Sequence, residues 1–238
     1  MYPTEKALYL IPVTLGDTSV EQVIPSHNHD IVMQLRHFIV ENTRSARRFL
    51  RQMDREFPID DCTFNEMGKH ADERLFNQYL EPLREGHSMG VISEAGCPAV
   101  ADPGADIVAI AQRQGLRVIP LAGPSSIIMA IMASGLNGQS FAFNGYLPVE
   151  ESDRAKRLKS LETRAWTEHQ TQLFIETPYR NRKMFDTLTR VLRPQTHLCV
   201  AAGITTPQEY IHTHTVQEWK QQKFPDLNKV PAIFLIGK

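Results

Sequence analysis

Two short segments rich in glycine, proline and small residues each lie between an apolar run and a helical pattern. Residues 93–104 read Ser-Glu-Ala-Gly-Cys-Pro-Ala-Val-Ala-Asp-Pro-Gly, and residues 122–126 read Ala-Gly-Pro-Ser-Ser. Small side chains let a backbone approach a ligand closely, and prolines hold a loop in one shape. The hydroxyls and free amides of the second segment suit an anionic group at a helix start. Both segments therefore predict a ligand site, with a tight connection and plain helix capping as the alternatives.

Three carboxylates are candidates for proton transfer beside these segments. Glu94 and Asp102 lie in the first of them, and Glu41 directly follows an apolar run. A carboxylate can take the proton of a hydroxyl acceptor during group transfer. Each of the three can equally be structural and bond loop amides.

A helix predicted at residues 44–53, with Thr43 as its N-cap, carries four arginines at positions i, i+3, i+4 and i+7. These are Arg44, Arg47, Arg48 and Arg51. The spacing places them on one helical face, and arginine matches phosphate and carboxylate geometry bidentately. The face predicts a polyanionic acceptor; the alternative is a solvated surface stripe.

Several other classes of site are not supported. The sequence contains no G-x-G-x-x-G, G-x-x-x-x-G-K-[ST], G-x-S-x-G or H-E-x-x-H motif. Two H-x-H pairs, at 27–29 and 212–214, lack an evident third ligand, so no metal site is expected. The three cysteines are widely spaced and form no C-x-x-C pair, which predicts neither a disulfide framework nor a zinc site.

The order of elements predicts an α/β fold with two domains. In the first half, apolar runs at 7–11, 37–40, 88–92 and 116–121 alternate with helical patterns at 44–53, 72–84 and 105–114. This rhythm is typical of a parallel sheet with crossover helices, which binds ligands outside the carboxyl ends of its strands. We expect this parallel-sheet domain to span residues 1–121.

The second half holds more strands than helices. Strand patterns occur at 141–143, 172–175, 198–201, 210–215 and 232–236, and helices only at about 125–133, 152–163 and 181–192. This composition favours a mixed-sheet α+β domain over residues 122–238.

Composition is that of a globular protein in the cytoplasm. Hydrophobic residues make up 42% and charged residues 22% of the 238 residues, and the formal net charge is -1. No global basic field is present to attract nucleic acid. The apolar run at residues 7–13 is too short for a secretory signal, and no apolar stretch reaches the roughly 20 residues of a membrane-spanning helix.

Five segments together resemble one known family. They are residues 41–44, residues 91–98 with 102–104, residues 118–125, residues 143–148 and residues 176–180. In this order they are similar to the tetrapyrrole methylase superfamily, the class III S-adenosylmethionine-dependent methyltransferases, and most to its branch acting on small-subunit ribosomal RNA. The resemblance extends over nearly the whole chain.

The resemblance implies a homodimer that binds S-adenosylmethionine in the cleft between its two domains, largely through loop backbone. Carried onto the matching positions, it implicates Pro12, Glu94, Ala95, Gly96, Pro98, Ser125, Ser126 and Leu147. For the adenine side it implicates Ala202, Pro231 and Ala232.

The sequence also departs from that branch. Asn42 replaces an acid, Glu94 an aspartate and Cys97 a threonine, while residues 201–206 lack the usual Arg, Glu and Lys. The sequence ends at Lys238, where many members continue into a basic helical extension. Three hypotheses stay open. The first is methylation of ribosomal RNA on a ribose 2′-hydroxyl, the second is methylation of another acceptor such as a carboxylate-bearing small molecule or a tetrapyrrole, and the third is a non-catalytic donor-binding scaffold.

Overall fold

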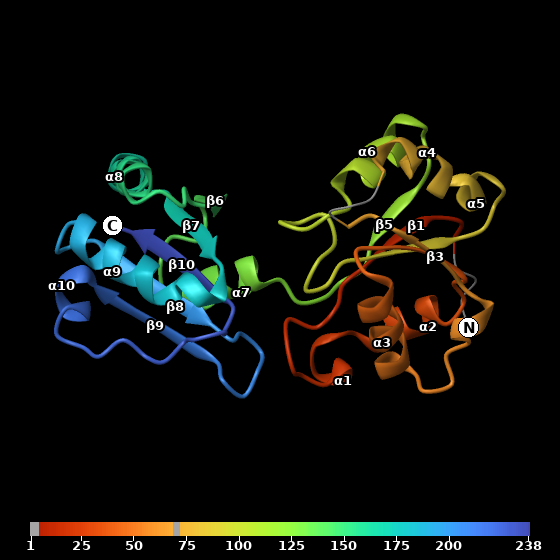
Figure 1. Ribbon diagram of the computed structural model, residues 1–238, viewed down its shortest axis with the longest axis horizontal. Helices are drawn as coiled ribbons and strands as arrows, with labels where there is room; N and C mark the ends of the chain where they lie inside the picture. Colours follow the sequence, from red (N-terminus) through yellow and green to blue (C-terminus); the bar gives the residue numbers. More distant parts are fainter. Residues whose placement is uncertain (1–4, 69–71) are drawn as a thin grey trace. The chain divides into compact units, whose positions relative to one another are not determined.

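A computed structural model describes residues 5–68 and 72–238 of the protein. The chain divides into two compact units, Met1–Ser125 and Ser126–Lys238, and each contains one five-stranded sheet (Figure 1).

The sheet of the first unit is entirely parallel, as the sequence predicts. Its strands lie in the order β3-β2-β4-β1-β5. They are β1 (Leu8–Ile11), β2 (His37–Val40), β3 (Thr63–Glu66), β4 (Met89–Ile92) and β5 (Val118–Pro120).

Helices cover both faces of this sheet (Figure 1). On one face lie α1 (Val20–Val23), α2 (Ser26–Val32) and α3 (Thr43–Met53), followed by the 3-10 turn Ile59–Asp61. On the other lie the 3-10 turn Glu73–Leu75 and the helices α4 (Phe76–Tyr79), α5 (Glu81–Arg84) and α6 (Ala105–Arg113).

Both faces are covered because neighbouring strand residues point to opposite sides. In β2, Phe38 and Val40 pack towards α1 to α3, whereas Ile39 packs towards α4 to α6. A strand with two buried faces needs a continuous apolar run, and for this reason β1, β2 and β4 can be predicted from the sequence.

Three local features differ from the sequence prediction. The helix expected at 72–84 is broken into a 3-10 turn, α4 and α5, because Pro82 has no amide hydrogen and is accommodated only in the first turn of a helix. Thr43 is not the N-cap of α3; the Asn42 side chain takes that role and accepts a hydrogen bond from the Ser45 amide. Strand β3 was not predicted, since its Thr-Phe-Asn-Glu sequence is polar and lies at a sheet edge.

The second unit has the mixed sheet that the sequence predicts, in the order β6-β7-β10-β8-β9. β6 and β7 are parallel and are joined through the long helix α8, while the other neighbours are antiparallel. The strands are β6 (Phe141–Tyr146), β7 (Thr171–Glu176), β8 (His197–Ala202), β9 (Tyr210–Thr215) and β10 (Ala232–Gly237).

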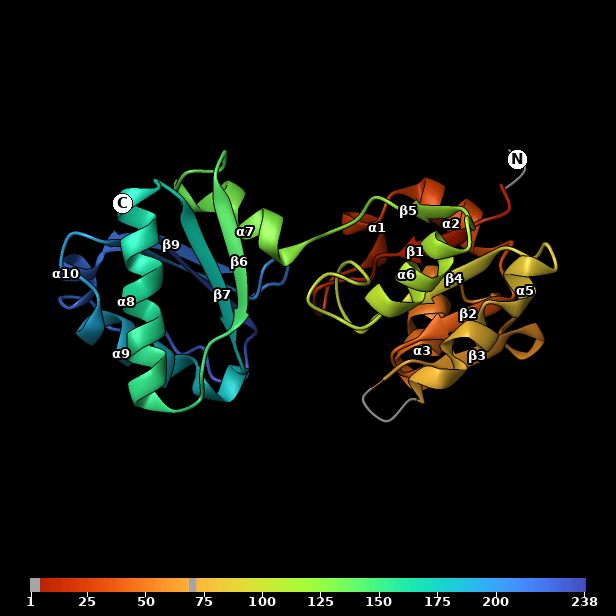
Figure 2. The same ribbon diagram turned by 90° about the horizontal axis from the view of Figure 1, so that it is seen from above.

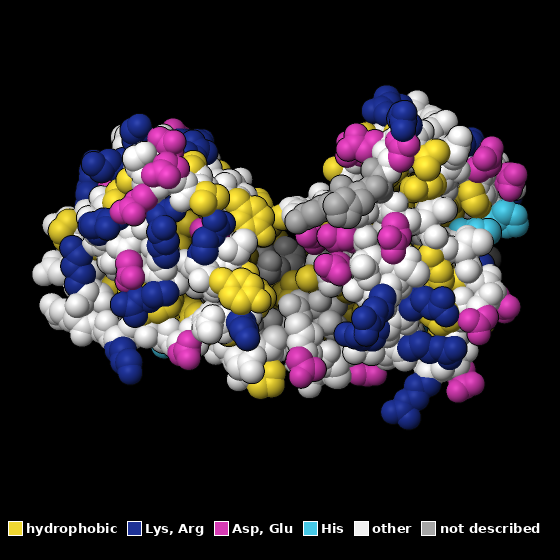
Figure 3. All heavy atoms as spheres, in the orientation of Figure 1, with side chains coloured by type: hydrophobic (Ala, Val, Ile, Leu, Met, Phe, Trp, Pro, Cys, Tyr) yellow, Lys and Arg dark blue, Asp and Glu magenta, His cyan; other side chains and the backbone are white. Residues whose placement is uncertain are grey.

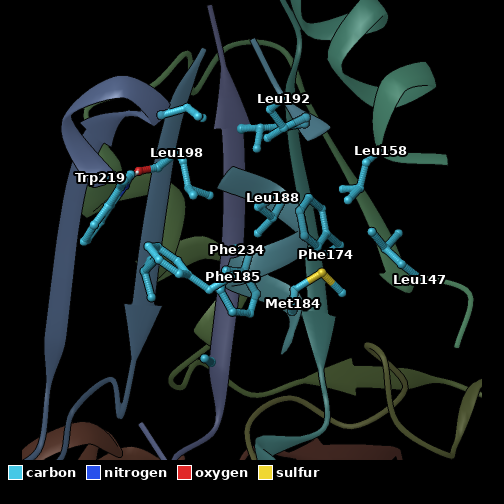
Figure 4. Packing of buried hydrophobic residues seen from close by; sticks show 14 of the residues in the cluster. Leu147, Leu158, Phe174, Met184, Phe185, Leu188, Leu192, Leu198, Trp219 and Phe234 are labelled. Carbon is cyan, nitrogen blue, oxygen red and sulfur yellow. Dashed lines mark hydrogen bonds between the residues drawn. The ribbon is translucent and has the colours of Figure 1, made fainter. Parts of the chain in front are cut away.

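One face of this sheet carries α8 (Glu151–Thr167), α9 (Asn181–Val191) and α10 (Val216–Trp219) (Figure 2). Figure 4 shows the core beneath them, where the Phe174 and Phe234 rings stack at 6.1 Å between centroids. The Trp219 indole is buried and donates a hydrogen bond of 2.8 Å to the Leu198 carbonyl. Helix α7 (Ser126–Ser134) contacts β8, β9 and β10 outside this core.

Candidate active site

The loops that follow β1, β4 and β5 meet at the carboxyl edge of the parallel sheet. The Val13 amide donates a hydrogen bond of 2.9 Å to the Gly96 carbonyl, which joins the first loop to the second. The Cys97 thiol lies 3.4 Å from the Pro124 carbonyl, which joins the second loop to the third. The segments 93–104 and 122–126, singled out in the sequence, are therefore in direct contact.

Glycine permits this close approach at two points. A Cβ on Gly123 would lie 2.2 Å from Cγ of Pro12, so the first and third loops touch where any side chain would separate them. Gly96 has a φ of +66° and faces Leu15 and the Pro124 carbonyl. Such positions favour glycine because it has no Cβ to clash.

The loop after β4 also holds two alanines in the left-handed region, Ala99 at φ 65° and Ala101 at φ 63°. A non-glycine residue there is strained and persists only when its surroundings impose it. The Ala99 amide bonds to the Pro103 carbonyl at 3.2 Å, which closes the loop on itself. The Ala99–Pro103 bond and the two left-handed alanines thus define a tight loop.

Asn28 is a support that sequence reasoning missed. It is buried, and its Nδ2 donates a hydrogen bond of 2.8 Å to the Ala122 carbonyl at the start of the third loop. A buried asparagine far away in the sequence gives no signal of such a partner.

Two of the predicted carboxylates, Glu41 and Glu94, are joined to each other and to α3 by hydrogen bonds. The Glu94 amide donates to Oε2 of Glu41 at 3.0 Å, and the Ser45 hydroxyl donates to Oε1 of Glu94 at 3.0 Å. Ser45, another residue that sequence reasoning missed, also donates its backbone amide to Oδ1 of Asn42, the N-cap of α3. The helix start and the loop after β4 are therefore linked.

Asp102 is the third carboxylate, and its charge is unfavourably placed. Burial raises the pKa of its carboxyl to about 6, and the nearby negative charges of Glu41 and Glu94 add to the effect, while a hydrogen bond from Ser93 opposes it. Burial, followed by the charge of Asp102, also raises the pKa of the Cys97 thiol. A carboxyl that titrates near neutrality suits proton transfer.

A further acid, Glu66 on β3, fixes the start of α3. Its Oε1 accepts a hydrogen bond of 2.8 Å from the Thr43 amide, and this bond lowers the pKa of Glu66. Glu66 was not among the predicted site residues because β3 itself was not predicted.

The four arginines predicted to line one helical face are all exposed on α3. Arg47 forms a 3.4 Å ion pair with the exposed Asp60, and the Arg51 guanidinium bonds to the Arg55 carbonyl. Figure 3 shows basic side chains gathered over α3. The helix starts at the carboxyl end of β2, so this basic face begins beside Glu41.

Four of the predicted donor residues, Leu147, Ala202, Pro231 and Ala232, lie in the second unit. Ala202 and Ala232 are paired between β8 and β10, and the Gly203 amide bonds to the Pro231 carbonyl at 3.0 Å. The side chains of Leu147, Ala202 and Ala232 belong to the buried core. Ser125 and Ser126 lie at the point where the chain passes from the first unit to the second.

The family-like segment 176–180 is a paired structural turn. Glu176 is buried, and its Oε1 accepts from the Thr177 amide at 2.7 Å and from the Arg180 guanidinium at 2.6 Å. These bonds fold the 3-10 turn Pro178–Arg180 and leave Tyr179 exposed on its outside.

The described residues were expected to hold no metal site. Within residues 5–68 and 72–238, no group of three or more His, Cys, Asp or Glu side chains is arranged to hold a metal ion. His29 lies 3.0 Å from Asp54, and the rings of His212 and His214 stack on β9. Within the same residues no helix is long and apolar enough to cross a membrane.

Comparison with known proteins agrees with the family resemblance. The model of the family described as Tetrapyrrole (Corrin/Porphyrin) Methylases matches residues 25–220. "Ribosomal RNA small subunit methyltransferase I" of Escherichia coli O157:H7 is 28% identical over 89% of this chain and 70% of that protein. The protein of the same name from Mesorhizobium japonicum is 31% identical over 90% of this chain and 69% of that protein.

Solved structures share the fold. The methyltransferase CobJ superposes with a TM-score of 0.63 at 15% identity, over 98% of this chain and 94% of that one. The cobalt precorrin-4 methyltransferase CbiF superposes with a TM-score of 0.61 at 16% identity, over all of this chain and 98% of that one. From its family match and its relatives, the chain is a methyltransferase that belongs to the tetrapyrrole methylase family.

Proposed function

We propose that this protein transfers a methyl group from S-adenosylmethionine to ribosomal RNA. The observation that carries the proposal is the contact of three loops at one sheet edge, beside a carboxyl with a raised pKa and a basic helical face. Donor and acceptor classes follow from the family and from the relatives' names.

The loops after β1, β4 and β5 supply the donor site in this proposal. Their backbone groups are brought together by Gly96 and Gly123, where a side chain would push the loops apart. The proposed donor contacts here are Pro12, Glu94, Ala95, Gly96, Pro98, Ser125 and Ser126. Leu147, Ala202, Pro231 and Ala232 are those of the second unit, and the placement of the donor between the two domains stays a prediction.

Methyl transfer needs little from the protein besides alignment and removal of water, because the sulfonium already carries an activated group. A hydroxyl acceptor must also lose its proton. Asp102 is our candidate base, because its raised pKa keeps its basicity high near neutral pH. Glu41 and Glu94, which bond to loop and helix groups, act in this scheme by positioning the loop and by raising the pKa of Asp102.

RNA is favoured as acceptor by the arginines on α3. Arg44, Arg47, Arg48 and Arg51 present guanidinium groups on one face, which suits a row of phosphates. Methylation of ribosomal RNA would take place in the cytoplasm, the compartment expected from the sequence. The homodimer implied by the resemblance is tested by the mass of the purified protein in solution.

The decisive experiment uses tritiated S-adenosylmethionine with small ribosomal subunits from cells that lack this gene. We expect label in the RNA, in a dinucleotide that resists alkaline hydrolysis because its 2′-hydroxyl is methylated. The same reaction is run with a small-molecule extract that contains tetrapyrroles. Label only in that extract would replace RNA by a small-molecule acceptor, and donor binding without transfer to either would favour a scaffold.

A further inference from the structure

The second unit contains a cavity of about 560 Å³ that belongs to none of the predicted site residues. One wall is the turn at 178–179 with the first residues of α9, and the other is the segment 223–228. Its volume lies within the range of sites for small organic ligands, which is about 300 to 1,000 Å³.

An aromatic ring stands at this cavity with unusual exposure. Tyr179 is 76% exposed, although large aromatic side chains usually bury most of their surface. Its backbone is fixed by the bonds from Glu176 to Thr177 and Arg180. The ring is therefore carried on a rigid turn and is free to stack on a planar ligand.

Two cations share the lining. The Arg182 guanidinium lies 5.7 Å from the centre of the Phe224 ring and bonds through Nε to Asp186. Lys223 precedes Phe224 on the opposite wall and has no ion-pair partner within the part of the chain that the structure describes. Asp226, the acid of the lining, accepts a hydrogen bond from the Asn228 amide at 3.2 Å.

The wall opposite α9 is anchored to the core. The Phe224 and Phe185 rings pack at 4.2 Å between centroids. Asn181 is only 1% exposed, and its Nδ2 donates to the carbonyls of Leu227 and Val230 at 3.1 and 2.7 Å. Its Oδ1 has no hydrogen-bond partner among residues 5–68 and 72–238. An unmet buried acceptor in a cavity lining calls for a donor, such as the amino group of a nucleobase.

We propose that this cavity binds one unpaired nucleotide of an RNA acceptor, with its base stacked on Tyr179 and its phosphate near Lys223 and Arg182. An exposed aromatic ring next to cations is the combination that binds single-stranded nucleic acid. The inference rests on RNA being the acceptor, and it adds a contact in the second unit to the basic face of the first.

The test measures binding of a fluorescein-labelled single-stranded RNA of about 12 nucleotides to the full chain by fluorescence anisotropy. Loss of one stacked base in Tyr179→Ala should weaken binding about tenfold, whereas Tyr179→Phe should keep the wild-type Kd because the ring remains. Lys223→Ala should lower the slope of log Kd against log salt by about one. Lys159→Ala, at an exposed lysine of α8 outside the cavity, is the matched control and should change neither quantity.

A wild-type Kd in Tyr179→Ala would overturn the nucleotide site, as would equal losses in Tyr179→Ala and Lys159→Ala. The proposed function is tested separately, by measuring the transfer of tritiated methyl groups from the donor to ribosomal subunits by the wild-type chain. Normal methylation of RNA together with an unaffected Tyr179→Ala would reject this site alone. Failure of the wild-type chain to bind single-stranded RNA would reject it as well.

Discussion

The loop at 93–104 and the turn at 176–180 both carry acids in family-like segments, yet the two differ in what balances the negative charge. In the turn, the Glu176 carboxylate is paired with Arg180 and accepts from a backbone amide. In the loop, Asp102 has two other acids as its electrostatic neighbours, Glu41 and Glu94, and its pKa is raised to about 6.

The comparison separates structural acids from chemically poised ones. A carboxylate that accepts hydrogen bonds from a guanidinium and a backbone amide fixes a backbone shape. A carboxyl that is partly buried among like charges holds its proton to higher pH, and such groups cluster at functional sites. Both segments resemble the family, and only the groups around each acid show which one has a structural role and which one has a raised pKa.

The largest effect is expected on activity. Asp102→Asn should lower the single-turnover rate of methyl transfer by about 10²- to 10⁴-fold, because it removes the proposed base while keeping the shape. Affinity for S-adenosylmethionine should be unchanged. Asp106→Asn, in the exposed first turn of α6, is the control. A wild-type rate in Asp102→Asn would remove Asp102 from the chemistry.

The matched change in the turn should act on stability. Glu176→Ala leaves the Arg180 guanidinium and the Thr177 amide without their acceptor, and should lower the free energy of unfolding by about 3 kcal/mol. Urea denaturation measures this. Glu168→Ala breaks an exposed i,i+4 pair with Arg164 and should cost less than about 0.5 kcal/mol. Equal losses in the two variants would contradict a structural role for the turn.

A smaller effect is expected at the basic face. The double change Arg44→Ala with Arg48→Ala should lower the slope of log Kd against log salt for ribosomal RNA by about two, one for each lost phosphate contact. Arg113→Ala, at the exposed end of α6, should leave the slope unchanged. An unchanged slope in the double variant would show that the arginine face is a solvated surface stripe that does not bind RNA phosphates.

The smallest effect is a pH dependence of stability. The pKa of Asp102 is raised from 3.8 to about 6 on folding, so the unfolded chain releases this proton first as pH rises. The Asp102 contribution to stability should therefore decline between about pH 4 and pH 6 and stay constant above. In urea titrations across this window, the free energy of unfolding of the wild type should fall relative to that of Asp102→Asn as the pH rises. Parallel curves would show that the carboxyl is not perturbed.

Much of the fold was predictable because the core strands are continuous apolar runs. The edge strand β3 was not, since its Thr63, Asn65 and Glu66 look like a loop. Pro82 is unfavourable inside the helix predicted at 72–84, but where the helix breaks depends on tertiary packing. The family and the methyltransferase activity were predicted and are confirmed by the comparisons.

The site was predictable only in outline. Their density of glycine and proline singled out the two loops in the sequence, and the structure brings them into contact through Cys97 and Pro124. The supports from Asn28, Ser45 and Glu66 were missed because each depends on a partner distant in the sequence. Tyr179 and Lys223 escaped notice for the same reason, since only the fold places them around one cavity.

The central claim is that the contact of the first and third loops creates the donor site, and calorimetry with S-adenosylmethionine tests it most directly. In Gly123→Ala the new Cβ would lie 2.2 Å from Cγ of Pro12, whereas in Gly115→Ala, at a φ of +67°, it would meet nothing within 4 Å. We predict one donor site per wild-type chain, wild-type affinity in Gly115→Ala, and at least about tenfold weaker binding in Gly123→Ala, the change that about 1.4 kcal/mol produces. Equal affinity in all three proteins, or no binding by the wild type, would contradict the account.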